Sequence, residues 1–274
     1  MSANTKQYLA LLKRNHMLYS LLSFVYHKTP HYKNYLRKKQ KNGDKAKNTI
    51  KRYLNNKYVV NHGPFSGVKY LSNSTMGSLL PKIIGSYEEP IQPWIKEVLR
   101  RKYSKIINLG SAEGYYAVGL AKGLPQSHVL ASDIDYRAQI LCNKLAKLNR
   151  CKNLTTEREL SHEKLNKEIV KNNTLILCDI EGAEEVVLNP RKVPHLMDTD
   201  IICEVHDHVV ARNITDTLLT RFHQTHTITI VVDNKRNLEK YSEILKLPKN
   251  TRAFALDEGR SGIAKWMRLL KRGN

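Results

Sequence analysis

The stretch INLGSAEGYYAVGLA, residues 107–121, joins an apolar, strand-like run to a helix of small residues through a turn with two glycines. A helix entered through such a turn leaves its first backbone N–H groups unpaired and pointing outward. Gly110 and Gly114 leave room for a ligand to approach those groups closely. An ordinary strand–turn–helix connection also uses such glycines, so both interpretations stay open for this stretch alone.

The same rhythm continues along the chain. Short β-branched runs at 105–110, 128–133, 174–180, 200–207, 227–234 and 252–258 alternate with helix-like stretches such as 136–150 and 211–224. Apolar runs separated by helices predict a parallel sheet covered on both faces. In open sheets of this kind, ligands bind beyond the carboxyl ends of the strands. The polar residues that end the strands are therefore the candidate site.

Carboxylates follow three of the predicted strands, and a carboxylate there must be hydrated, hydrogen-bonded or metal-bound. They are Asp133 and Asp135, then Asp179 and Glu181, then Glu204 and Asp207. Asp133 follows Gly110 by 23 positions, where an acid that holds ribose hydroxyls is expected. The turn, G-S-A-E-G, lacks the last glycine of the G-x-G-x-x-G dinucleotide fingerprint. A nucleoside cofactor without a pyrophosphate therefore fits it better.

Three segments together resemble a known family. INLGSAEGYYAVGLA, VLASDID and LCDIEGAEEVVL are similar to class I S-adenosylmethionine-dependent methyltransferases of the FkbM-like group, and DIEGAE is the most specific of their motifs. The resemblance covers residues 105–207, with weaker support to about 260. It implies an α/β, Rossmann-like fold with a seven-stranded, mostly parallel sheet, an antiparallel last strand and helices on both faces. It also implies O-methylation of a hydroxyl on a sugar, a glycan or a small natural product.

The resemblance also implies which residues bind S-adenosylmethionine. Gly110 to Tyr115 face its methionine part, Asp133 its ribose, and Asp179 the region of methyl transfer. The predicted cofactor-binding residues are Asn108, Gly110, Ser111, Gly114, Tyr115, Asp133, Ile134 and Asp179. Asn108 departs from the family pattern, which usually has an acid at this position.

Methyl transfer needs the acceptor aligned with the methyl group and a proton removed from the acceptor. The predicted catalytic residues are Asp179, Glu181 and His206. A divalent metal such as Mg²⁺, bound by Asp179 with Glu204 or Asp207, is a second way to activate an alcohol. In a purely structural interpretation, Glu204 and Asp207 cap the next helix and His206 is an exposed turn residue.

Positive charge is concentrated at the start of the chain. The 274 residues have a formal net charge of +21, and residues 1–60 hold 14 Lys and Arg against one acid, Asp44. We expect three regions: a basic helical extension (1–60), a helical lead-in (61–104) and the methyltransferase domain (105–274). The extension is either a solvated basic tail or a docking segment for RNA, a phosphorylated glycan or a lipid surface.

Two alternative functions stay open: an RNA methyltransferase, acting on ribose or base and recruited by the basic segment, and a non-catalytic polyanion-binding protein on a relict fold. Amino-group methylation of a base is typically accompanied by Asn or Asp, two prolines and an aromatic residue after the fourth strand, whereas this chain has DIEG there. Four cysteines without a CxxC pair and no apolar run long enough to span a bilayer lead us to expect a cytoplasmic protein without a transmembrane segment.

Overall fold

The computed structural model describes residues 58–72, 74–207, 213–233, 236–247, 249, 252, 255–260 and 263–273. The predicted basic extension therefore lies outside the described residues, except for its last three. Within the described part of the chain, no helix combines the length and the apolar character needed to cross a bilayer.

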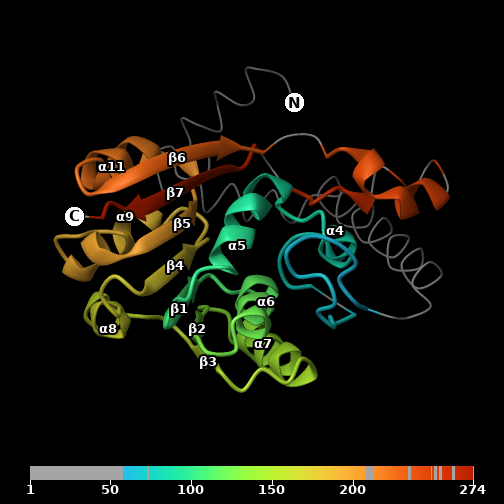
Figure 1. The fold of residues 1–274 in the computed structure, drawn as a ribbon, viewed down its shortest axis with the longest axis horizontal. Coiled ribbons are helices and arrows are strands. Elements are labelled where there is room, and N and C mark those ends of the chain that lie inside the picture. Colours follow the sequence, from blue (N-terminus) through green and yellow to red (C-terminus); the bar gives the residue numbers. More distant parts are fainter. Residues whose placement is uncertain are drawn as a thin grey trace, which may run out of the picture. The chain divides into compact units, whose positions relative to one another are not determined.

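Seven strands form one sheet in the order β3-β2-β1-β4-β5-β7-β6 (Figure 1). Strands β1 to β5 pair in parallel, and β7 is antiparallel to both of its neighbours. Their bounds are β1 Lys105–Leu109, β2 His128–Ser132, β3 Leu154–Glu157, β4 Thr174–Cys178, β5 Asp200–Glu204, β6 His226–Val232 and β7 Lys265–Lys271. The seven-stranded sheet with an antiparallel last strand is confirmed.

The two central strands explain where a site can form. Every residue of β1 and β4 is buried, as expected for apolar strands covered on both faces. The chain leaves β1 toward β2 on one side, and β4 lies on the other side, with Asn108 between Ala131 and Leu177 in register. This reversal of strand order is the switch point where open α/β sheets bind ligands.

Helices cover the sheet. On one face, α8, α11 and the short helix η2 contribute Leu165, Phe222 and Leu196 to a core that includes Ile107 of β1. Helices α6 and α7 contact each other and strands β2 and β3. The bounds are α4 Leu79–Ile84, η1 Glu89–Ile91, α5 Gln92–Val98, α6 Tyr115–Gly123, α7 Tyr136–Leu148, α8 His162–Glu168, α9 Glu184–Val187, η2 Pro194–Asp198, α11 Ile214–Phe222, η3 Leu238–Lys240 and η4 Ser242–Lys246.

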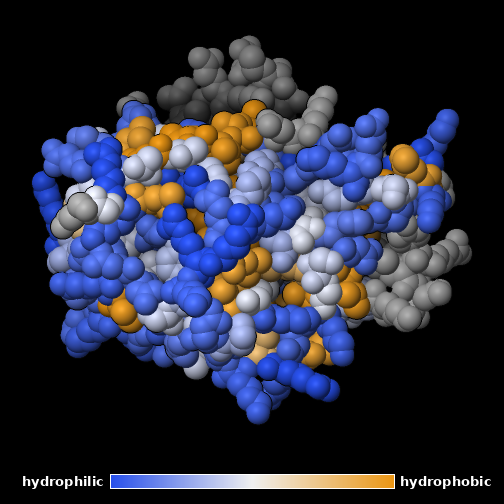
Figure 2. Space-filling model, viewed as in Figure 1, coloured by the Kyte–Doolittle hydropathy of each residue, from blue (hydrophilic) through white to orange (hydrophobic). Residues whose placement is uncertain are grey.

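Figure 2 shows a mostly hydrophilic face, with hydrophobic residues gathered over β6. Strand β6 is an edge strand of the sheet, and Ile230 and Val232 on it are 39% and 46% exposed.

One strand prediction is wrong. The described residues of 252–258 form no strand, and two strands, β3 and β7, lie where none was predicted. Strand β3, LTTE, is half-exposed and mostly polar, and β7 mixes Lys265, Arg268 and Lys271 with apolar residues. Neither sequence has the all-apolar character by which the other strands were recognised.

Candidate functional site

A cavity of about 680 Å³ opens at the carboxyl ends of β1, β2, β4 and β5. It is within the size range of small-molecule and cofactor sites. The predicted site residues that line it are Asn108, Gly110, Ser111, Tyr115, Asp133, Ile134, Asp179, Glu181, Glu204 and His206, whereas Gly114 and Asp207 are not among its lining residues.

The two glycines of the β1–α6 turn are required by the protein's own packing. Gly110 has φ +75°, and a Cβ there would lie 1.6 Å from the carbonyl oxygen of Asp179. Gly114 has φ +97°, and a Cβ there would lie 2.8 Å from the Sγ of Cys142. The turn therefore fits tightly against β4 and α7, and only Gly110 also faces the cavity.

Three buried polar side chains on this side of the cavity each have an oxygen atom without a hydrogen-bond partner among the described residues. Asn108, Ser111 and Tyr115 are at most 5% exposed and line the cavity. Among the described residues, no group hydrogen-bonds Asn108 Oδ1, the Ser111 hydroxyl or the Tyr115 hydroxyl. A buried polar group without a partner costs about 1–3 kcal/mol. Three of them beside one turn fit a polar ligand such as the amino-acid part of S-adenosylmethionine.

Asp133 connects the end of β2 to the same turn. Its Oδ2 accepts a hydrogen bond from the Ala112 backbone N–H at 2.7 Å, and its Oδ1 accepts one from Asp135 N–H at 2.8 Å. Each carboxylate oxygen can accept a second donor, so Asp133 can also bind a hydroxyl in the cavity. Ile134, which is 73% exposed, adds apolar surface to the lining.

Sequence reasoning missed Glu159 and Leu160, which line the cavity just after β3. Because β3 itself was not predicted, no site residue was predicted at its carboxyl end.

The predicted catalytic residues come together at the ends of β4 and β5. His206 Nε2 lies 3.5 Å from Glu181 Oε2 and 3.7 Å from Asp179 Oδ1. On the other side of the ring, Nδ1 lies 2.7 Å from Oε1 of the fully buried Glu184. His206 is only 4% exposed, so it is no exposed turn residue.

Asp207 is separate from this group. Its carboxylate accepts hydrogen bonds from the Thr215 backbone N–H and hydroxyl in the first turn of α11, and from Lys265. Asp207 therefore binds the first turn of α11, whose N-cap residue is Asn213. Among the described residues, the groups close enough to share a metal ion are Asp179, Glu181 and His206, or Glu88, Asp179 and Glu204.

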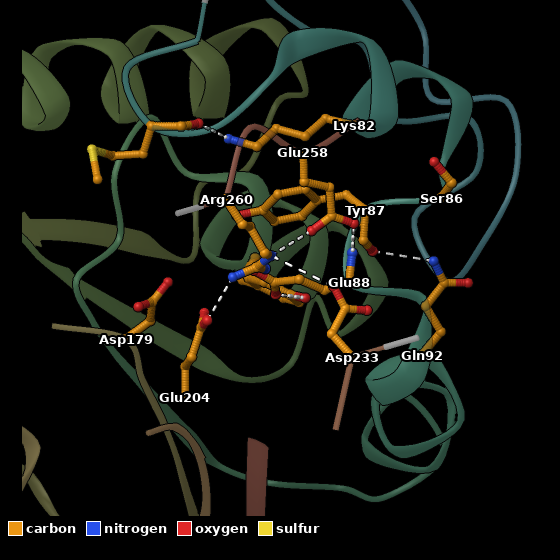
Figure 3. A network of polar contacts seen from close by, with 12 residues as sticks. Lys82, Ser86, Tyr87, Glu88, Gln92, Asp179, Glu204, Asp233, Glu258 and Arg260 are labelled. Atoms are coloured by element: carbon orange, nitrogen blue, oxygen red, sulfur yellow. Dashed lines mark hydrogen bonds and ion pairs between the residues drawn. The ribbon is translucent and has the colours of Figure 1, made fainter. Parts of the chain in front are cut away.

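Arg260 lies among three carboxylates, those of Glu88, Glu204 and Glu258 (Figure 3). Its guanidinium is 2.7 Å from Glu88 and 2.5 Å from Glu204, and its Nε donates to Glu258 at 2.8 Å. Figure 3 shows Asp179 beside Glu204. Glu88, Glu258 and Arg260 come from segments without any recognisable motif, so no sequence signal pointed to them.

Crowding of carboxylates changes their acidity. Burial, together with the charge of Glu88, raises the pKa of Asp179 to about 7. Burial and the charge of Asp179 raise the pKa of Glu204 to about 10. Burial by itself lowers the pKa of His206, but the hydrogen bond to Glu184 and the charge of Asp179 outweigh it and raise that pKa.

A second buried cluster holds the wall of the cavity. Glu113, in the β1–α6 turn, accepts hydrogen bonds from Tyr70, Ser74, Thr75 and Lys82. Burial opposes its ionisation, but the charge of Lys82 prevails and lowers the pKa of Glu113 to about 2. Through these hydrogen bonds, Glu113 attaches the segment of residues 70–82, here called the strap, to the β1–α6 turn. Residues 75–77 of the strap line the cavity.

Comparison with known proteins gives one sequence relative. No family model matches the chain. It is 31% identical over 133 residues to a release factor glutamine methyltransferase of Flavobacterium psychrophilum, covering 46% of this chain and 45% of the relative. The alignment thus spans less than half of that protein.

Many solved structures overlap with the chain, and two of them serve as examples. An O-methyltransferase from Bacillus cereus in complex with SAH is 13% identical with a TM-score of 0.43, covering 64% of this chain and 77% of that one. A precorrin-6y C5,15-methyltransferase from Geobacter metallireducens is 10% identical with a TM-score of 0.44, covering 64% and 84%.

The strand order, the antiparallel β7 and the cavity at the switch point define the class I methyltransferase fold. This assignment rests on the topology of the chain itself. Membership of the FkbM-like group stays a prediction.

Proposed function

We propose that the protein is an S-adenosylmethionine-dependent methyltransferase that methylates a hydroxyl group of a sugar, a glycan or a small natural product. The observation that carries this proposal is a single cavity. It joins the unpartnered polar atoms of the β1–α6 turn to the carboxylate–histidine group at the ends of β4 and β5. One part can hold the methyl donor while the other deprotonates an acceptor.

The first part of the cavity fits the cofactor. Asn108 Oδ1 would accept a hydrogen bond from the amino-acid part, and the hydroxyls of Ser111 and Tyr115 would donate or accept one. Asp133 would hold the ribose, with Ile134 against an apolar face of the ligand. When bound, S-adenosylmethionine supplies a methyl group already activated by its positive sulfur.

The second part of the cavity provides a base. An alcohol gives up its proton reluctantly, and a positioned side chain contributes about 10²- to 10⁴-fold to the rate by accepting it. Imidazole is suited to this task near neutral pH. We assign it to His206 Nε2, with Asp179 and Glu181 orienting the acceptor hydroxyl beside it.

The charge of the cavity favours a neutral acceptor over an anionic one. Even without Asp179 and Glu204, whose pKa values are raised, five acidic side chains line it, against the two basic side chains of Lys82 and Arg260. A phosphate group would therefore meet net repulsion there. The relative named above acts on glutamine, but Asp179-Ile-Glu-Gly follows β4 here, without the two prolines and aromatic residue associated with amino-group methylation.

Two measurements test the proposal. Isothermal titration of the full chain with S-adenosylmethionine and with its demethylated product should show binding of both at one site. Transfer of labelled methyl groups to fractionated cell extract should then label a neutral sugar or small molecule. Absence of cofactor binding would refute the activity, and label confined to RNA would replace the acceptor class.

A further inference from the structure

Glu184 is a buried carboxylate with no place in the mechanism above. It is the first residue of α9, and its side chain is fully buried. Its Oε1 lies 2.7 Å from His206 Nδ1 and accepts a second hydrogen bond from the Gly182 backbone N–H at 3.0 Å. It therefore contacts the side of the ring opposite Asp179 and Glu181.

This contact determines which ring nitrogen carries the proton. A carboxylate only accepts hydrogen bonds, so the ring must donate from Nδ1. In the neutral imidazole, Nε2 is then the acceptor. Nε2 is also the nitrogen that faces the cavity carboxylates, at 3.5 Å from Glu181, 3.7 Å from Asp179 and 3.8 Å from Glu204.

The local backbone places these groups around a single ring. Glu181 has φ +54° and Gly182 has φ +106°, so the chain turns sharply after β4. A non-glycine residue in that region costs about 1–3 kcal/mol. The turn directs Glu181 and Glu184 to different nitrogens of His206.

The second oxygen of Glu184, Oε2, is buried and has no hydrogen-bond partner within the described residues. A carboxylate kept only for folding would be expected to have both oxygens paired, because an unpaired buried oxygen is destabilising.

We propose that Glu184 is a positioning residue that holds His206 in the tautomer protonated on Nδ1, with Nε2 directed at the acceptor hydroxyl. This inference rests on the proposed function. In the step it supports, the acceptor oxygen loses its proton to Nε2 and forms a bond to the methyl carbon. The bond from that carbon to sulfur breaks, and its electron pair stays on sulfur.

The tautomer can be measured without any activity. In full-length protein labelled with ¹⁵N-histidine, at a pH above the raised pKa of His206 where its ring is neutral, the ring shifts of His206 distinguish protonation at Nδ1 from protonation at Nε2, with His206→Gln assigning the signals. We expect the Nδ1–H form in the wild type, its retention in Glu184→Gln, whose carbonyl still accepts, and a mixture of tautomers in Glu184→Ala. An unchanged Nδ1–H tautomer in Glu184→Ala would overturn the inference.

Kinetics then separate positioning from folding. In Glu184→Ala we expect kcat to fall by about 100-fold, the smaller end of a general-base contribution, with cofactor affinity unchanged. Glu184→Gln should recover most of that loss, and Glu185→Gln, one residue along α9, should match the wild type. If Glu184→Ala fails to fold, Glu184→Gln still decides: loss of the Nδ1–H tautomer in it contradicts the proposal.

The two proposals fail in different ways. Wild-type turnover by Glu184→Ala, with cofactor binding intact, refutes the role of Glu184 and leaves the methyltransferase standing. A wild-type chain that binds no cofactor refutes the methyltransferase, and the catalytic role of Glu184 with it.

Discussion

At the scale of the residue, Asp179 serves two neighbours at once. Its carbonyl oxygen lies against Gly110, and its side chain faces His206 across the cavity. The main chain of Asp179 thus fixes the turn that would hold the cofactor, while its side chain belongs to the acceptor end.

Replacing Asp179 by Asn keeps the main-chain contact and removes the charge. We expect turnover to fall at least about 100-fold. The melting temperature at neutral pH should not fall by more than about 4 °C. Steady-state kinetics and scanning calorimetry check this, with Asp198→Asn, just before the amino end of β5 and outside the cavity lining, as control. Wild-type turnover in Asp179→Asn would remove this residue from the mechanism.

The raised pKa of Asp179 predicts that the stability of the protein depends on pH, and Asp179→Asn is the variant for comparison. The pKa of Asp179 is about 7 in the folded chain, above its ordinary value of 3.8. The folded state therefore binds this proton more tightly, and that stability is full below about pH 4 and lost as the pH rises to about 7. Melting temperatures of the wild type should thus fall relative to Asp179→Asn across this interval. Parallel curves would contradict the raised pKa.

Substitution of Gly110 tests whether the β1–α6 turn needs a residue without a side chain at this position. In Gly110→Ala, the new Cβ would overlap the Asp179 carbonyl at 1.6 Å, so the backbone must move. We expect a loss of at least about 3 kcal/mol in the free energy of unfolding, together with loss of cofactor binding. Gly67→Ala is the matched control, because Gly67 also has a positive φ, +83°, but no atom within 4 Å of its Cβ position. Its cost should stay at about 1–2 kcal/mol. Urea unfolding and calorimetry compare them, and equal losses would contradict the steric argument.

At the scale of the element, the sequence predicted the central strands and the residues that end them, because apolar strands buried on both faces have a clear pattern. Strands β3 and β7 were missed because partial exposure and charged residues interrupt that pattern. Contacts made across long separations, such as Arg260 with Glu88, depend on tertiary structure and leave no local signal.

The strap (residues 70–82) offers a prediction at this scale. Glu113→Ala would leave Lys82 buried without its carboxylate partner, which costs about 3–5 kcal/mol. We expect faster hydrogen exchange at Thr75 and weaker cofactor binding, since residues 75–77 line the cavity. Glu163→Ala, which removes an exposed pair with Lys167, should cost at most about 1 kcal/mol. Unchanged exchange in Glu113→Ala would show that the strap is held by other contacts.

At the scale of the whole molecule, positive charge is concentrated in residues 1–60 and acidic side chains are gathered around the cavity. The chain is strongly basic, with a formal net charge of +21, yet most of the charged side chains that line its cavity are acidic. A polyanion attracted by the basic residues 1–60 is therefore not expected to enter the cavity.

Binding measurements can separate these two regions. A single-stranded RNA oligonucleotide should bind the full chain with an affinity that falls steeply with salt, as phosphate contacts release counterions. The same oligonucleotide at saturation should leave the affinity for S-adenosylmethionine unchanged. Competition between the two ligands would place RNA in the cavity and favour the RNA methyltransferase.

Under the proposed function, the acidic side chains around the cavity would also influence how the spent cofactor leaves after each reaction cycle. Under the proposed function, the methyl donor enters with one net positive charge, and the demethylated product is neutral. A negative lining attracts the former more strongly than the latter. The inhibition constant of the demethylated product should therefore exceed the dissociation constant of the donor, which product-inhibition kinetics and calorimetry can check.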